Sequence, residues 1–104
     1  MTHKEASAIL DEFEQCFINN PSIGQYLGAT SLTTELMLKW EKTKGNLDKV
    51  RESLRKRGKD PTAWCIAVYL KEGLTELPEG VSLPASFKNL NVHVLPPMKP
   101  QDAY

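Results

Sequence analysis

Asp60-Pro-Thr-Ala-Trp-Cys-Ile-Ala-Val-Tyr-Leu-Lys-Glu-Gly73 is the stretch that decides the fold, because it holds the longest apolar run of the chain. Trp, Ile, Val and Tyr favour a strand, and a buried strand can be apolar throughout. However, Asp60 and Pro61 are typical of a helix start, and Gly73 is a typical stop. The interval of about twelve residues is long for a strand. We therefore predict a buried helix over 61–72; a strand there would make the fold α/β.

The segments before this stretch have the apolar spacing of amphipathic helices. The strongest pattern covers residues 3–19, where a capping box at Thr2 and Glu5 should start a helix. This helix should bury the apolar residues Ile9, Phe13 and Phe17.

Three further helices are expected, each ended by a glycine. They cover residues 21–27, a segment beginning at Ser31, and a segment capped by Asn46, and they stop at Gly28, Gly45 and Gly58.

The sequence after Gly73 has a different pattern, in which prolines and Gly80 interrupt any helix. Alternating apolar residues predict a short strand over 90–95, which residues 81–83 could pair with. The fold class we predict is mostly α, a compact bundle of four or five short helices with a small C-terminal β element and an extended Pro-rich tail. Residues 1–95 form the single helical domain in this prediction, and residues 96–104 form the tail.

Charge is balanced over the whole chain, with 13 basic and 13 acidic residues, but it is unevenly distributed. Residues 39–59 hold nine basic residues against three acidic ones. Lysine and arginine beside phosphates release condensed counterions, which gives affinity for nucleic acid without base specificity. We therefore predict a non-catalytic nucleic-acid-binding module, with the candidate contacts Lys39, Lys42, Lys44, Arg51, Arg55, Lys56, Arg57 and Lys59.

The concentration of basic residues could also arise without any ligand. Cations in the last turn of a helix complement its dipole, and charged faces keep helices solvated. The alternative function is a protein-protein adaptor or regulatory subunit, which could self-associate. An exposed apolar patch well away from residues 39–59 would favour this alternative.

The sequence carries no pattern typical of a catalytic, metal or cofactor site, so we predict no enzyme, no metal and no cofactor. His3 and His93 are the only histidines, and neither has a second ligand nearby in the sequence. Cys16 and Cys65 lie among apolar neighbours, and we expect both to be buried as small hydrophobes. No apolar run is long enough for a membrane span and the first residues lack a signal-peptide pattern, so we expect a cytoplasmic protein.

Residues 20–40 resemble the helix-turn-helix motif of DNA-binding domains. Ile23 and Leu27 stand at core positions of that motif, Gly24 at its small-residue position and Gly28 at its turn, and Thr30 would cap the recognition helix. The resemblance implies a DNA-binding function. Thr34 departs from the motif, which has an apolar residue there. An alternative is that Leu32, Leu36 and Trp40 form a buried stripe, which would turn the recognition face inward.

Overall fold

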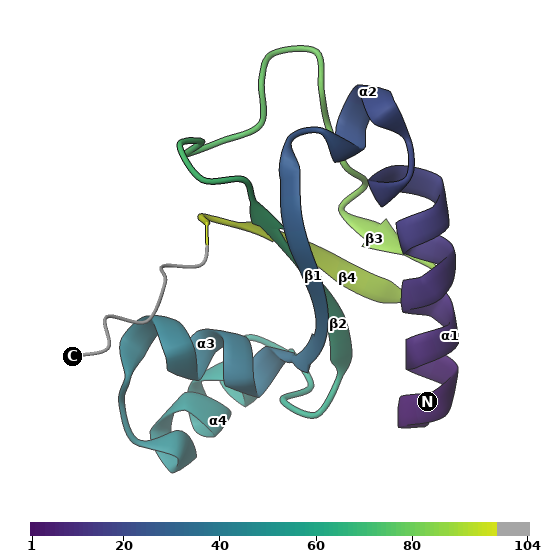
Figure 1. Ribbon diagram of the computed structural model, residues 1–104. Helices are drawn as coiled ribbons and strands as arrows, with labels where there is room; N and C mark the ends of the chain where they lie inside the picture. Colours follow the sequence, from purple (N-terminus) through teal and green to yellow (C-terminus); the bar gives the residue numbers. More distant parts are fainter. Residues whose placement is uncertain (98–104) are drawn as a thin grey trace, which may run out of the picture.

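A four-stranded mixed sheet is the centre of the fold (Figure 1). The computed structural model describes residues 1–97, apart from the side chain of Lys42. The strands are β1 (Leu27–Thr34), β2 (Trp64–Leu70), β3 (Ser86–Phe87) and β4 (Leu90–Leu95), in the order β1-β2-β4-β3. β2 pairs antiparallel with β1 and parallel with β4, and β3 pairs antiparallel with β4.

Four α-helices and one π-helical turn accompany the sheet. They are α1 (His3–Phe13), the π-helical η1 (Glu14–Ile18), α2 (Pro21–Gly24), α3 (Glu35–Thr43) and α4 (Leu47–Lys56). The fold is α/β, and our prediction of a mostly α bundle is wrong.

The helix predicted over 61–72 is strand β2, at the centre of the sheet. A central strand covered on both faces needs an apolar side chain at every position, which explains the unbroken run. The helix signals at its ends belong to turns instead. Asp60 accepts hydrogen bonds from the backbone and hydroxyl groups of Thr62, and Gly73 has a φ of 94° in the turn after the strand.

The helix expected from Ser31 begins only at Glu35, because residues 27–34 form β1. Leu32 lies opposite Ile66 in the β1–β2 pair, so its helical spacing from Leu36 is coincidental. Residues 29–34 contain three threonines, whose branched side chains favour a strand. The segment that resembles a helix-turn-helix motif therefore holds short α2, a strand and the beginning of α3, with no second helix directly after Gly28.

The starts of α1 and α4 agree with the helix starts predicted from the sequence. Thr2 and Glu5 form the capping box of α1, and Asn46 caps α4 through the backbone N–H groups of Asp48 and Lys49. Phe13 is fully buried in the core, as predicted, and Ile9 and Phe17 pack against it partly buried.

The predicted strand over 90–95 is confirmed as β4, but its hairpin partner is β3 and not residues 81–83. Lys88 and Asn89 connect the two strands with φ values of 46° and 71°. Positive φ at both central residues matches a type I′ turn, for which glycine is the common second residue. Of the predicted Pro-rich tail, residues 98–104 lie outside the described part of the chain.

The sheet has two differently covered faces. One face packs against α1 and forms the main core, around Phe13, Ile66 and Val68. The other face carries Cys65 and Ala67, which pack against Leu38 of α3. α3 and α4 connect β1 to β2 and lie together on the side of the molecule away from α1 (Figure 1).

Candidate functional site

The helical hairpin of α3 and α4 carries all the predicted nucleic-acid contacts except Arg57 and Lys59, which directly follow α4. Val50 and Leu54 form the buried side of α4. Lys39 Nζ on α3 donates to Ser53 Oγ on α4 over 3.1 Å, which ties the two helices together.

The connection between the two helices is built around Trp40. Its Nε1 donates to the carbonyl oxygen of Gly45 over 2.9 Å, and Lys44 Nζ lies 4.8 Å from its ring centroid. Lys44 ends α3 in the left-handed conformation, with φ 53°. The Trp40 indole thus already has a hydrogen-bond partner and a cation–π partner within the hairpin, and Lys44 lies over its face.

Three of the predicted basic residues, Lys39, Arg57 and Lys59, lie close enough for Arg57 and Lys59 to act electrostatically on Lys39; we call them the basic cluster. Partial burial, followed by the positive charges of Arg57 and Lys59, lowers the pKa of Lys39 below its ordinary value. The two segments meet because the chain after α4 crosses the start of α3, where Leu36 N–H donates to the Pro61 carbonyl.

The structure does not bring Arg51, Arg55 and Lys56 to this cluster. Helical spacing places Arg51 and Arg55 on the flank of α4 opposite to Ser53, the contact of Lys39. Arg51 pairs with Asp48 at 2.9 Å, and Lys56 pairs with Glu52 at 3.6 Å. These pairs lie within one helix and are exposed, so they contribute little to stability.

A second group of polar residues lies on the sheet face beneath α3. Glu35 is the first residue of α3 and is buried, with 6% of its surface exposed. Its Oε1 accepts hydrogen bonds from Asn91 Nδ2 at 3.0 Å and from His93 Nε2 at 3.2 Å. Cys65 is opposite Asn91 in the parallel β2–β4 pair, and the thiol is fully buried. We call Glu35, Cys65, Asn91 and His93 the Glu35 cluster.

The pKa values of Glu35 and Cys65 are shifted in opposite directions. Burial disfavours the Glu35 carboxylate, but hydrogen bonds from Asn91 and His93 and the charges of His93 and Lys59 outweigh it, so the pKa lies below its ordinary value. Burial and the neighbouring Glu35 raise the pKa of Cys65 to about 12. The buried carboxylate is therefore ionised at neutral pH and the thiol is protonated.

This arrangement decides which chemistry the cluster can perform as it stands. A nucleophilic cysteine needs an accessible thiolate. The Cys65 thiol is buried and protonated, so it does not meet either requirement. However, Glu35, Cys65 and His93 each place one ligand atom within 4.8 Å of the others, so these three residues could hold a metal ion.

The sequence-based prediction of no metal site missed this group because its members are far apart in the chain. The available signal was the alternation of side chains between the two faces of a strand. Cys65 and His93 lie on the same face if 64–70 and 90–95 are neighbouring parallel strands. Because we predicted a helix for 61–72, we did not place Cys65 and His93 on a shared sheet face. The prediction that both cysteines are buried is confirmed for Cys65 and wrong for Cys16, which is exposed.

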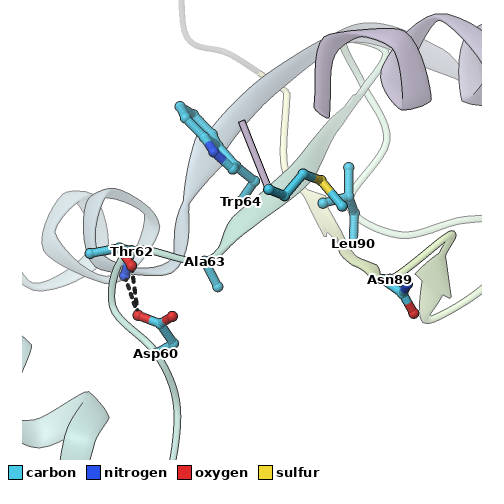
Figure 2. Close-up of a pocket in the computed structure, with 7 residues that line it drawn as sticks. Asp60, Thr62, Ala63, Trp64, Asn89 and Leu90 are labelled. Carbon is cyan, nitrogen blue, oxygen red and sulfur yellow. Dashed lines mark hydrogen bonds between the residues drawn. The ribbon is translucent and has the colours of Figure 1, made fainter. Parts of the chain in front are cut away.

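A pocket of about 260 Å³ lies at the beginning of β2, and Figure 2 shows residues that line it. Its walls come from the turn before β2 and the first residue of that strand, from Met1, and from Asn89 and Leu90 at the start of β4. Asp60 is the carboxylate in this pocket, and its oxygen is already bound by Thr62. Asp60 is thus the one titratable side chain among the residues that line the pocket.

Within residues 1–97, no helix is long and apolar enough to cross a membrane. No family of known proteins, no curated protein and no solved structure matches this chain.

Proposed function

We propose that this chain binds nucleic acid without sequence specificity, through the basic cluster and the neighbouring cations of the α3–α4 hairpin. The proximity of Lys39, Arg57 and Lys59 carries the proposal. Lys39 comes from α3, whereas Arg57 and Lys59 follow α4; burial and then the positive charges of Arg57 and Lys59 lower the pKa of Lys39. A phosphate backbone would offset the repulsion between these charges and release its own counterions.

The helix dipole accounts for Arg57, which is the C-cap residue of α4, but not for Lys39 and Lys59. Arg55 and Lys56 lie in the last turn of α4, where cations complement the dipole. Lys39 lies in the middle of α3, and Lys59 lies beyond the end of α4. Within the described residues, no carboxylate forms an ion pair with Lys39, Arg57 or Lys59. The charge of the cluster thus remains available to an anion.

The adaptor function has weaker support. The exposed large apolar residues of the described part are Met1, Met37, Leu47 and Val94. Met37 and Leu47 belong to the basic hairpin itself, which leaves two isolated side chains elsewhere and no group of apolar residues typical of a docking surface. A cytoplasmic location is part of the proposal, since both cysteines are free thiols.

The test is fluorescence anisotropy with labelled duplex DNA, single-stranded DNA and RNA at low salt, where screening is weakest. The wild type should bind, and the logarithm of its affinity should fall linearly with the logarithm of the salt concentration. The double variant Arg57→Gln, Lys59→Gln should bind more weakly, and its salt slope should be smaller by about one unit for each lost phosphate contact.

The matched control is Lys4→Gln, Lys71→Gln, which removes the same charge from exposed positions outside the hairpin. It should retain more affinity than the Arg57, Lys59 variant. Equal losses in both variants would mean that net charge alone causes binding, and no binding by the wild type would reject the proposal in favour of an adaptor.

A further inference from the structure

We propose that Glu35, Cys65 and His93 bind a single zinc ion, on the sheet face opposite the main core. This site is independent of the nucleic-acid function proposed above. Its three residues supply one carboxylate oxygen, one sulfur and one imidazole nitrogen. Thiolate and imidazole ligands favour zinc over magnesium and calcium, which prefer oxygen ligands throughout.

The distances between the ligand atoms suit a small tetrahedral ion. All three atoms lie within 4.8 Å of one another, and Oε1 of Glu35 is 3.2 Å from Nε2 of His93. Zinc bonds of about 2.0 Å to nitrogen and oxygen and about 2.3 Å to sulfur require ligand atoms roughly 3.3–3.6 Å apart. Small side-chain rotations are therefore enough to close the site.

The backbone holds the three residues in place before any ion arrives. Cys65 and His93 are on adjacent strands β2 and β4, two residues out of register on the same face. Glu35 begins α3 directly after Thr34, whose hydroxyl group caps the helix. Asn91 holds the carboxylate from the side and would remain as its hydrogen-bond donor when a metal is bound.

Charge balance gives a second argument. Glu35 is the one buried charged or polar residue in the described part of the chain, and without a metal its carboxylate is stabilised by hydrogen bonds from Asn91 and His93. Zinc with one carboxylate, one thiolate and a neutral imidazole has no net charge. The metal would thus neutralise the buried carboxylate and allow the neighbouring thiol to ionise.

Metal binding must displace one proton from the site. In the metal-free state Nε2 of His93 donates to Glu35, and the Cys65 thiol is protonated. Coordination through Nε2 moves the imidazole proton to Nδ1, and coordination through sulfur releases the thiol proton to solvent. Affinity should therefore rise about tenfold for each pH unit at neutral pH.

Solvent can reach the site from the histidine side. The side chain of His93 is 29% exposed, whereas that of Glu35 is 7% exposed. Three protein ligands leave the fourth tetrahedral position for water, as in zinc sites that are open to a further ligand.

The experiment is a titration of the metal-free full chain with Zn²⁺ in competition with a chromophoric chelator, and with Co²⁺ as a spectroscopic probe. We expect one ion for each chain, release of one proton, and thiolate-to-cobalt charge-transfer absorption in the near ultraviolet. Cys65→Ala and His93→Gln should each weaken zinc binding by more than about 100-fold, and Asn91→Ala should weaken it by about 10–100-fold.

The matched controls are Cys16→Ala and His3→Gln, which remove the other cysteine and the other histidine of the chain. Both should bind zinc as the wild type does. His93 is partly exposed, so its variant should fold even if Cys65→Ala does not, and circular dichroism checks this. Absence of zinc binding, a cobalt spectrum without thiolate absorption, or binding that His93→Gln leaves unchanged would overturn the proposal.

Discussion

Nε2 of His93 lies 3.2 Å from Oε1 of Glu35, although 58 positions separate the two residues in the chain. Glu35 comes from the beginning of α3, and His93 comes from β4. The contact joins the helical hairpin to the sheet, and together with the hydrogen bond from Asn91 it opposes the effect of burial on the pKa of Glu35.

Replacing Glu35 should change how stability depends on pH. The pKa of Glu35 is lower in the folded protein than its ordinary value of 4.5. Its ionised form therefore stabilises the fold above about pH 4.5, and this contribution is lost as the pH falls through the folded-state pKa. Glu35→Gln should be less stable than the wild type at neutral pH, and the difference should narrow below pH 4.5.

Urea unfolding at several pH values, in the presence of a metal chelator, measures this difference. Glu76→Gln, which removes an exposed carboxylate outside the cluster, is the control for the loss of one charge. A constant difference between wild type and Glu35→Gln from pH 7 to pH 3 would contradict the assignment.

The two thiols should react at very different rates. Cys16 is exposed, whereas Cys65 is fully buried with a pKa of about 12. A thiol-specific disulfide reagent should modify one cysteine for each native metal-free chain and two for each chain in denaturant. Cys16→Ser should abolish the fast native reaction, and a fast reaction that persists in this variant would show that Cys65 is accessible.

Gly24→Ala should destabilise the fold through a backbone clash. A Cβ atom at position 24 would overlap the Ile18 carbonyl oxygen and lie 2.8 Å from its carbonyl carbon, and both atoms belong to the backbone, so a side-chain rotation cannot relieve the clash. We expect a loss of about 1–3 kcal/mol in the free energy of unfolding. Gly45→Ala is the control, because its nearest contact would be 3.7 Å away; equal stability of the two variants would contradict the clash.

Phe13→Ala should remove the centre of the main core. The ring is fully buried and packs against Phe17 and Phe87, with ring centroids 4.8 and 5.5 Å away. The free energy of unfolding should fall by about 3–5 kcal/mol, whereas Leu47→Ala at an exposed position should change it by less than about 0.5 kcal/mol. Thermal or urea unfolding measures both, and a small effect of Phe13→Ala would show that the core lies elsewhere.

Short-range hydrogen bonds made part of this fold predictable from the sequence. Thr2 caps a backbone group three residues away, and Asn46 caps groups two and three residues away, so both helix starts depend only on their own segments. The alternation of apolar and polar residues over 90–95 is also a property of its own segment, and it correctly predicted β4. The concentration of basic residues in 39–59 was also visible in the sequence.

Tertiary structure decided the rest, because a strand has no hydrogen-bond partners within its own segment. Residues 64–70 are a strand because β1 and β4 border them on both sides, and neither neighbour is apparent from the local pattern. The same pairing places Cys65 beside His93, and the packing of α3 then adds Glu35. The sequence determined the helix starts at Thr2 and Asn46 and the place where charge gathers, while long-range pairing determined which side chains meet.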